Sequence, residues 1–289
     1  MTGIILVDKP EGWTSHDVVA KLRGVLHERR IGHSGTLDPL ATGLLVVFLG
    51  RATRAVEFAE NDFKEYTAGV RFGIETDTQD ITGTVLRKCD CSVTYDQLEH
   101  ELATFRGDIN QVPPMYSALK VNGQPMYKLA RKGKTVERTA RCLHIEKLEI
   151  LSGENTDWVL KIRCSKGTYV RTLCNDIGAA LGCGGAMTSL RRTAAGAFDI
   201  KYAHTLDEII SASGSGQADR LILPVDSLFS AYPRREISTD AEVKCRNGNR
   251  FRQNVPDGEY RVYSQTGEFL MLGKASNGMV STVKSFFEV

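Results

Sequence analysis

The sequence predicts an α/β fold of the α+β type, in which helices cover a mixed, largely antiparallel sheet. Three observations support this prediction. Short runs such as Trp158 to Cys164 alternate between apolar and polar residues with the period of a strand. Other segments begin with a capping threonine and continue with apolar residues at helical spacing. The chain has 289 residues, of which 42% are hydrophobic, and this is enough to bury a full core.

The first 50 residues predict a strand, a helix and a second strand. Residues 3 to 7 are apolar and short enough for a strand. Thr14 precedes a run with helical periodicity, and Asp17 stands three residues later, where a capping box places its acidic partner. This helix is expected to end near Arg29 and Arg30. The apolar run from Leu44 to Leu49 then predicts a buried strand.

Between this helix and the second strand lies the loop R-I-G-H-S-G-T-L-D-P-L-A-T-G-L-L, residues 30 to 45. Its glycines permit backbone angles that other residues avoid. Pro39 fixes its own φ and pushes Asp38 toward an extended conformation. A carboxylate with a fixed orientation and apolar neighbours suits a catalytic aspartate. The other interpretation is that Asp38 hydrogen-bonds its own turn, as aspartates before proline often do.

The middle of the chain predicts further strands and helices. Residues 64 to 73 alternate like a strand, and a polar loop follows at residues 75 to 83. Thr94 and Gln97 form a second capping-box pattern before a helix. After the strand at residues 158 to 164, apolar residues at helical spacing predict a helix that Gly182 closes.

A basic segment interrupts this pattern. Net charge is only +2, yet residues 120 to 141 carry seven Lys or Arg and one acid. Pro113 and Pro114 argue against a regular core element at the start of the segment, so residues 112 to 141 are predicted to protrude. Basic residues interleaved with Tyr116 and Tyr127 suit a surface that follows a nucleic-acid backbone. The alternative is an ordinary solvated face.

Cysteine usage and hydropathy limit the possible locations of the protein. The seven cysteines form no C-x-x-C pair, and the chain carries no recognisable signal peptide, which together indicate reduced thiols in a cytoplasm. The spacing of Cys89 and Cys91 is poor for zinc, so no metal site is predicted there. No apolar run approaches the length of a membrane helix.

The end of the chain predicts a separate small unit. Residues 211 to 216 are small residues and predict a mobile loop. Pro233 precedes a unit whose runs at residues 260 to 263 and 269 to 272 flank a turn, as in a hairpin. The predicted domains are therefore residues 1 to 232 and residues 233 to 289.

The loop around Asp38 resembles the signature of the TruB family of tRNA pseudouridine synthases. The family's other motifs follow in order: Lys9-Pro10 near the start, S-K-G-T-Y-V-R-T-L from Ser165, and L-R-R-T from Leu190. The likeness extends over most of residues 3 to 200 and weakens afterwards. It implies a pseudouridine-synthase fold, an insertion at about residues 112 to 141 that binds RNA, and a small C-terminal β-barrel, a PUA-like RNA-binding domain, at residues 233 to 289.

The resemblance also implies roles for individual residues. Asp38 matches the catalytic nucleophile of the family, and Arg171 matches the arginine that pairs with it. Tyr66 matches the active-site tyrosine that lies against the target base and helps to remove a proton. The implied RNA and uridine pocket consists of His33, Tyr66, Asp80, Tyr169 and Leu190.

The implied activity is isomerisation of uridine to pseudouridine at position 55 in the T-loop of tRNA, on a base that flips out of the loop. No metal or other cofactor is expected. The expected partner is the tRNA T stem-loop, with no membrane, no obligatory protein partner and a monomeric enzyme. One alternative is a non-catalytic tRNA binder or folding chaperone, against which the intact set of Asp38, Tyr66 and Arg171 argues. Another is a guide-RNA-dependent synthase, against which the absence of a long basic tail argues. A hydrolase that uses Asp38 is the most distant alternative, because no paired carboxylate or catalytic serine motif accompanies it.

Overall fold

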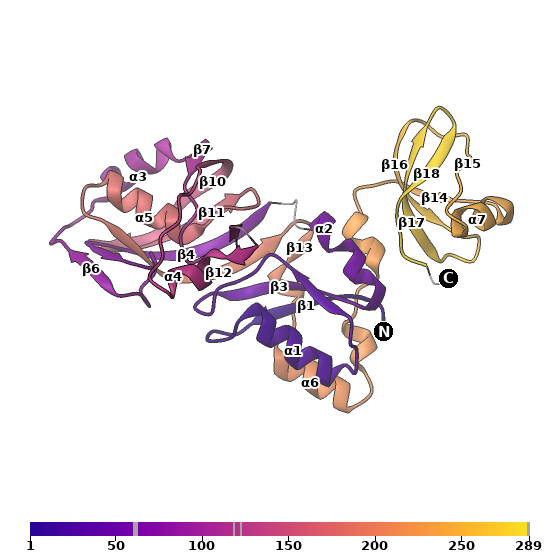
Figure 1. The fold of residues 1–289 in the computed structure, drawn as a ribbon, viewed down its shortest axis with the longest axis horizontal. Helices are drawn as coiled ribbons and strands as arrows, with labels where there is room; N and C mark the ends of the chain where they lie inside the picture. Colours follow the sequence, from indigo (N-terminus) through magenta and orange to yellow (C-terminus); the bar gives the residue numbers. More distant parts are fainter. Residues whose placement is uncertain (60–62, 118, 122, 288–289) are drawn as a thin grey trace.

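The structure is a computed structural model that describes residues 1–59, 63–117, 119–121 and 123–287. The predicted basic segment and the C-terminal unit therefore each include positions outside the described residues, namely 118, 122, 288 and 289. Figure 1 shows an elongated molecule with one large sheet and a smaller C-terminal sheet at one end. No helix in the described parts of the chain has the length and apolar character needed to cross a bilayer.

A nine-stranded sheet forms the body of the molecule. Every pairing within it is antiparallel except that of β12 with β3. This confirms the predicted mixed, largely antiparallel sheet. In order along the sheet the strands are β1 (Gly3–Lys9), β3 (Thr42–Leu49), β12 (Gly185–Ala195), β4 (Lys64–Phe72), β11 (Asp157–Cys164), β10 (Arg141–Glu154) and β7 (Gly107–Gln111), while β2 (Ile31–Ser34) pairs with β3 and β13 (Phe198–Asp199) pairs with β12.

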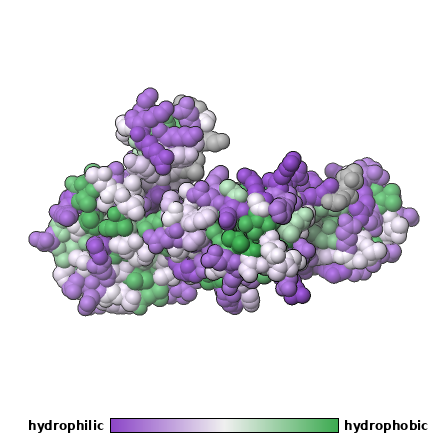
Figure 2. All heavy atoms as spheres, turned by 90° about the horizontal axis from the view of Figure 1, so that it is seen from below, coloured by the Kyte–Doolittle hydropathy of each residue, from purple (hydrophilic) through white to green (hydrophobic). Residues whose placement is uncertain are grey.

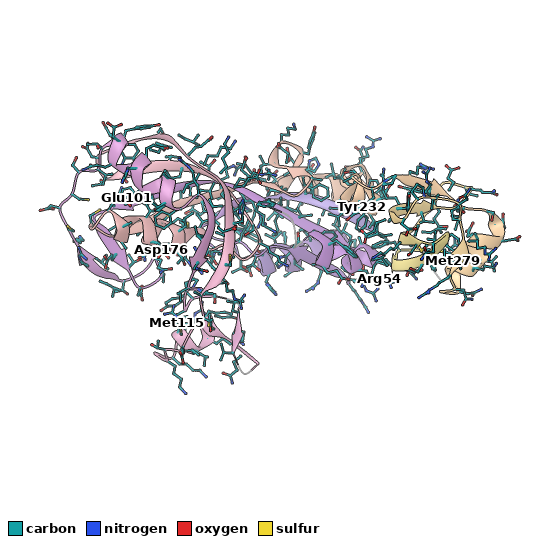
Figure 3. The ribbon with its side chains drawn as sticks, turned by 90° about the horizontal axis from the view of Figure 1, so that it is seen from above. Arg54, Glu101, Met115, Asp176, Tyr232 and Met279 are labelled. Atoms are coloured by element: carbon teal, nitrogen blue, oxygen red, sulfur yellow. The ribbon has the colours of Figure 1, made fainter. Side chains whose placement is uncertain are left out.

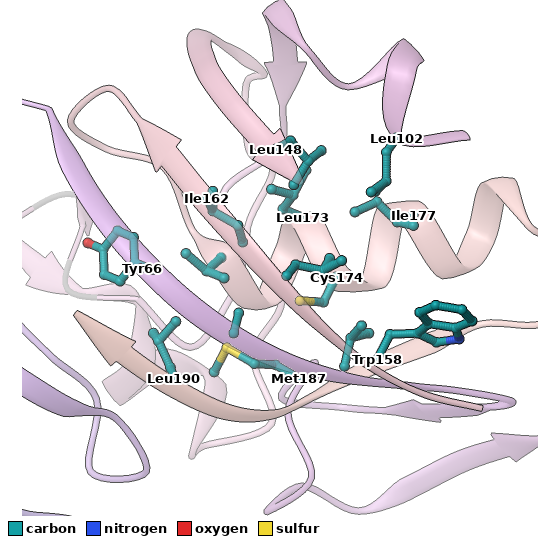
Figure 4. Packing of buried hydrophobic residues seen from close by; sticks show 14 of the residues in the cluster. Tyr66, Leu102, Leu148, Trp158, Ile162, Leu173, Cys174, Ile177, Met187 and Leu190 are labelled. Atoms are coloured by element: carbon teal, nitrogen blue, oxygen red, sulfur yellow. The ribbon is translucent and has the colours of Figure 1, made fainter. Parts of the chain in front are cut away.

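Two helices cover one half of this sheet, α3 (Tyr95–Thr104) and α5 (Val170–Ala180). Leu102 of α3 and Leu173 of α5 belong to one buried cluster with residues of β4, β10, β11 and β12. Figure 4 shows the aromatic ring of Tyr66 at the edge of this cluster, with its hydroxyl directed away from the labelled apolar side chains. This half of the sheet therefore has an apolar core, with the Tyr66 hydroxyl at its edge.

The other half consists of β1, β2 and β3, and it is buried on both faces. Helices α1 (Ser15–Val25) and α6 (Leu206–Gly214) pack on one face, where Val7 and Val47 lie. The opposite face carries Leu6 and Phe48 and packs against residues of the short helices. These are α2 (Val56–Ala59), η1 (Gly50–Ala55) and η4 (Val225–Phe229); η2 (Ile200–Tyr202) and η3 (Ala218–Leu221) complete the connections. Burial on both faces explains why β3 is a continuous apolar run rather than an alternating one.

The predicted starts of α1 and α3 are confirmed, whereas the predicted end of α1 and the predicted loop at residues 211 to 216 are wrong. Thr14 and Thr94 both form complete capping boxes. Helix α1 ends at Val25 and not near Arg29, because the next turn is broken by His27 at a φ of 51°. Residues 211 to 214, predicted as a loop, are the last turn of α6, which a capping box at Thr205 begins. Small residues do not prevent a helix that is capped and packed.

The C-terminal unit forms a second, five-stranded sheet, with the order β14 (Arg234–Glu236), β16 (Gly258–Tyr263), β17 (Phe269–Ser276), β18 (Met279–Ser285) and β15 (Phe251–Arg252), accompanied by α7 (Thr239–Arg246). The predicted hairpin is β16 and β17. This sheet has its own buried cluster. It also contacts the body, because Phe286 packs against Phe229 with ring centroids 5.7 Å apart.

The range of residues 112 to 141 is here called the projecting segment, and part of its described residues stands out from the body near Met115 (Figure 3). The segment contains β8 (Lys120–Val121), β9 (Gln124–Pro125) and α4 (Met126–Ala130). Figure 2 shows that hydrophilic residues cover most of this protrusion. A separate hairpin, β5 (Ile74–Thr76) and β6 (Val85–Lys88), occupies part of the predicted polar loop.

Candidate active site in the cleft of the main sheet

A cavity of about 560 Å³ opens between the loop after β2, the strands β4 and β12, and the start of α5. Six of the seven predicted site residues line it: His33, Asp38, Tyr66, Tyr169, Arg171 and Leu190. The seventh, Asp80, is buried outside this lining. The sequence therefore identified residues from four separate segments that the fold brings to one cavity.

The connection between β1 and α1 holds the loop that carries Asp38. The Ser15 hydroxyl accepts from Leu37 N–H at 2.9 Å and donates to the Leu37 carbonyl. The Gly12 N–H donates to the Pro39 carbonyl at 2.8 Å. Asp38 thus lies between two residues whose backbones are fixed by another segment.

Lys9 also holds the connection between β1 and α1. Its ammonium group donates to the carbonyls of Pro10 and Trp13, at 2.9 and 2.6 Å. Burial lowers the pKa of Lys9 to about 8, and the nearby Asp38 opposes this shift. Lys9 therefore contributes a positive charge near Asp38 without lining the cavity.

Gly43 is required by the geometry at the end of the loop. Its φ is +97°, and a β-carbon there would lie 2.4 Å from the carbonyl oxygen of Arg192. This close approach is where β3 meets β12 in the one parallel pairing of the sheet. Any side chain at Gly43 would push the Asp38 loop away from β12.

Asp38 and Arg171 form an ion pair across the cavity. Arg171 lies in the first turn of α5, and one guanidinium nitrogen donates to Asp38 Oδ2. Its other terminal nitrogen donates to the carbonyl of Tyr116 in the projecting segment. The Arg171 side chain is 6% exposed and that of Asp38 is 40% exposed, so the carboxylate is the accessible member of the pair.

The pKa of Asp38 is set by burial as well as by the pairing with Arg171. Burial raises the pKa of Asp38 above its usual value, and Asp80 raises it further. Arg171 and, more weakly, Lys9 oppose this rise. The carboxylate is therefore more basic than an ordinary aspartate despite its arginine partner.

Tyr66 and Leu190 come from neighbouring strands and form an apolar wall. Leu190 of β12 lies opposite Ala68 of β4, two positions along the strand from Tyr66. Both side chains are buried at the edge of the cavity. Burial raises the pKa of Tyr66, so its phenol is neutral at physiological pH.

Tyr169 stands at the N-cap of α5 and is held by a residue that the sequence analysis missed. Gln111, at the end of β7, accepts from the Tyr169 N–H at 2.9 Å and donates to the Tyr169 carbonyl at 3.2 Å. The Arg171 guanidinium lies over the Tyr169 ring, 5.8 Å from its centroid. Nothing in the local sequence around Gln111 signals this contact, since the two residues are 58 positions apart.

His33 lines the cavity from β2, edge-on to His16 with ring centroids 5.6 Å apart. Burial lowers the pKa of His33 to about 4, and the nearby His16 and Arg192 lower it too. The imidazole is therefore neutral at physiological pH. A neutral ring in the cavity lining can stack on a base but carries no charge for a phosphate.

Asp80 is fixed in a turn by threonines. The Thr78 hydroxyl, the Thr82 N–H and the Thr82 hydroxyl donate to its Oδ1, at 2.9, 3.0 and 2.6 Å. It is 5% exposed, yet its charge reaches Asp38. Asp80 thus acts on the site through its field rather than as part of the cavity wall.

Four basic residues of the lining were not predicted as site residues: Lys64, Arg141, Lys166 and Arg192. The L-R-R-T motif contains Arg191 and Arg192, but only Arg191 is exposed, where it pairs with Asp8. Arg192 is fully buried. Within the described ranges, no group of three or more His, Cys, Asp or Glu side chains can hold a metal ion.

Comparison with known proteins places this geometry in a family. Residues 23–170 match the model described as "TruB family pseudouridylate synthase (N terminal domain)", and residues 171–230 match "tRNA pseudouridylate synthase B C-terminal domain". Proteins named tRNA pseudouridine synthase B from Stutzerimonas stutzeri and Pseudomonas aeruginosa are both 43% identical to the chain. The alignments cover 96% of this chain and 92% and 93% of those proteins.

Solved structures agree with this result. A Cbf5-Nop10-Gar1 complex contains a chain that is 27% identical, with a TM-score of 0.75 over 99% of this chain and 85% of that one. A structure of an H/ACA RNP bound to a substrate RNA containing 2'-deoxyuridine gives the same TM-score and coverage at 25% identity. These structures confirm the predicted pseudouridine-synthase fold, and with the matches above they establish that the chain belongs to the TruB family of pseudouridylate synthases.

Proposed function

We propose that this chain isomerises uridine to pseudouridine in tRNA, at position 55 of the T-loop. One observation carries the proposal: in a member of this family, the accessible carboxylate Asp38 is ion-paired with the buried Arg171 at a cavity with an apolar wall. The name tRNA pseudouridine synthase B, borne by relatives that align over nearly the whole chain, supports tRNA as the substrate.

The reaction moves the glycosidic bond of uridine from N1 to C5. The N1–C1' bond breaks and a C5–C1' bond forms, while C5 loses a proton and N1 gains one. An oriented carboxylate nucleophile, a pocket that holds the detached base and a proton acceptor are sufficient for this chemistry. No co-reactant is consumed, because the product is an isomer of the substrate.

Asp38 is the proposed nucleophile. Its backbone is fixed on both sides by Ser15 and Gly12, which reduces the entropy cost of aligning it with the uridine. Arg171 holds the carboxylate in one orientation through a charge-assisted hydrogen bond. The raised pKa of Asp38 makes the ionised carboxylate a stronger base and nucleophile than an exposed aspartate.

Tyr66, Tyr169 and Leu190 are the proposed walls of the uridine pocket. The Tyr66 ring lines the cavity and supplies a flat face for the base. Its hydroxyl points away from the labelled apolar side chains (Figure 4). Tyr66 is also the proposed acceptor of the C5 proton. Leu190 packs against the other edge of the base, and Tyr169 closes the pocket beside Arg171.

RNA binding involves residues around the cavity. A base in a folded loop must flip out before it can reach Asp38, at a cost of a few kcal/mol. We assign His33, a neutral ring of the cavity lining, to stack where the base was, and Asp80, which is buried outside the lining, to act near the flipped nucleotides through its charge. The basic projecting segment is assigned to the phosphates of the T stem-loop.

Residues 1 to 232 are the proposed catalytic domain and residues 233 to 289 a PUA-like RNA-binding domain. The separate core of the second sheet and the exposed Arg250 and Arg252 support this division. Arg246 is less suited to RNA, because it pairs with Glu242 and Glu268. The protein is proposed to act in the cytoplasm as a monomer, without a protein partner or guide RNA.

Mapping pseudouridine in an unmodified tRNA transcript after incubation with the purified chain tests the proposal. Pseudouridine at position 55, without any added RNA or protein, is the expected result, and the Asp38→Asn variant serves as the matched control. Binding without modification would instead support a tRNA folding chaperone. Modification only after a guide RNA is added would support a guide-dependent synthase.

A further inference from the structure

Arg192 places a buried positive charge in the cavity wall without enough partners to compensate it. Its side chain is wholly inaccessible to solvent. Nε donates to the Leu44 carbonyl at 2.6 Å, but among the described residues neither Nη1 nor Nη2 makes a hydrogen bond of ordinary geometry, although a looser side-chain hydrogen bond with Arg192 lowers the pKa of Tyr66. A buried charge with unmet donors is costly unless a nearby group accepts from it or carries the opposite charge.

The side chain opposite Arg192 is Tyr66. The two residues are direct partners in the antiparallel pairing of β12 and β4. Their side chains therefore project from the same face of the sheet, with β-carbons about 4.5–5.5 Å apart. Both residues line the cavity. The phenol oxygen of Tyr66 points away from the labelled apolar side chains, so those side chains do not separate it from the Arg192 guanidinium.

The electrostatics of the site link the two groups. Burial raises the pKa of Tyr66, and the guanidinium of Arg192 is the strongest influence that opposes this rise. Cys164 and Asp38 act in the same direction as burial. Within the described residues, the other titratable groups near this pair are Lys64 at the start of β4, His33 on β2 and Lys9 on β1.

We propose that Arg192 is a positioning residue for Tyr66, whose phenol oxygen it orients in the cavity and whose phenolate it stabilises during proton transfer from C5 of the uridine. A guanidinium has donors and no acceptor, and it does not lose its proton in proteins. The Tyr66 oxygen can therefore only accept from Arg192, and the phenol hydrogen must point elsewhere, toward the substrate. This inference rests on the proposed function.

The proton balance of the isomerisation fits such a pair. The Tyr66 O–H bond breaks as its proton passes to N1 of the detached base, which leaves a phenolate beside the Arg192 guanidinium. After the C5–C1' bond has formed, the phenolate oxygen takes the C5 proton, and the C–H bonding electrons restore the C5–C6 double bond of the ring. Tyr66 ends the cycle as it began, so no external acid or base is required.

The test measures the Tyr66 phenol directly, by NMR titration of ¹³Cζ-labelled tyrosine in the full-length free protein, with Tyr66→Phe to assign the signal. Arg192→Met is expected to raise the pKa of Tyr66 above that of the wild type, whereas Arg192→Lys is expected to raise it less. Arg71→Met is the matched control, since Arg71 lies on β4, is exposed and pairs with Asp157 outside the cavity. An unchanged Tyr66 pKa in Arg192→Met would overturn the proposal.

A second measurement reports the reaction. With saturating tRNA that carries tritium at C5 of the target uridine, Arg192→Met should release tritium about 100-fold more slowly, the usual scale of general acid–base catalysis. Its half-saturating tRNA concentration should stay near the wild-type value. Weaker binding with a flatter salt dependence, and no change in the Tyr66 pKa, would make Arg192 a phosphate contact and contradict the proposal.

Two further outcomes remain decisive. If Arg192→Met does not fold, Arg192→Lys decides alone, because a lost rate with an unshifted Tyr66 pKa would contradict the proposed role. If the wild-type chain makes no pseudouridine while the Tyr66 pKa still responds to Arg192, the proposed function fails and the electrostatic pairing stands. The two failures are therefore distinguishable.

Discussion

Removing three exposed positive charges from the projecting segment should flatten the salt dependence of tRNA binding. Arg131, Lys132 and Lys134 follow α4 and are all exposed. Among the described residues, none of the three is ion-paired with a carboxylate, and none lines the cavity. They are therefore free to neutralise phosphates, and replacing them with glutamine should not disturb the site.

The magnitude follows from counterion release. Each phosphate contact contributes about 0.7 to 0.9 to the slope of log affinity against log salt, so three contacts contribute about 2 to 3. Between 50 and 200 mM salt, the wild type should therefore lose about 20- to 40-fold more affinity than the triple variant. The single-turnover rate at saturating tRNA should change little, because the three side chains lie outside the cavity.

The assay is equilibrium binding of fluorescently labelled tRNA across a salt series. A control variant with Arg71, Lys88 and Lys147 replaced by glutamine loses the same net charge from positions outside the segment, of which Arg71 and Lys88 are exposed and Lys147 is half-buried. If the segment contacts phosphates, the control keeps the wild-type slope. An unchanged slope in the segment variant would refute the reasoning, and equal flattening in both variants would reduce the effect to overall charge.

Four other predictions concern the cavity and its loop. Asp38→Asn should abolish pseudouridine formation and leave tRNA binding intact, as measured by product mapping and filter binding. Arg171→Lys should lower the saturated rate about 100-fold, with a smaller effect on affinity, because lysine cannot donate from a planar fork to both Asp38 and Tyr116. The single-turnover rate should fall as the pH drops through the raised pKa of Asp38, since the carboxylate must be ionised. Arg171→Met should move this fall in rate to higher pH, because Arg171 opposes the increase in the pKa of Asp38. Gly43→Ala should lower the free energy of unfolding by about 1–3 kcal/mol more than Gly182→Ala in urea titrations, because both glycines have positive φ but only Gly43 faces backbone at 2.4 Å.

The parts of the fold that the sequence predicts well are those set by local chemistry. Thr14 and Thr94 begin helices because their side chains cap the backbone within three residues, and this signal is complete in the sequence. The strand at residues 157 to 164 likewise follows from alternation alone. The end of α1 and the last turn of α6, which was predicted as a loop, are harder to predict, because tertiary packing rather than a single residue decides how far a helix continues.

The site residues that were missed depend on long-range pairing. Arg191 and Arg192 are adjacent, but consecutive residues of a strand point to opposite faces. Arg191 therefore reaches solvent and Asp8, while Arg192 is buried beside Tyr66. The face that carries the cavity depends on long-range strand pairings, such as the parallel contact of β12 with β3 between residues about 150 positions apart. Gln111 was also missed because its partner, Tyr169, is 58 positions away in the sequence.

The bond between Arg171 and the Tyr116 carbonyl makes the acidity of Asp38 dependent on the position of the projecting segment. Arg171 divides its donors between Asp38 and Tyr116, so a movement of the segment changes how fully the guanidinium stabilises the ionised carboxylate. Thermodynamic linkage makes such coupling reciprocal. If the position of the segment changes the proton affinity of Asp38, then protonation of Asp38 changes the equilibrium position of the segment by the same free energy. RNA that displaces Tyr116 would then be accompanied by proton uptake or release before any glycosidic bond has broken.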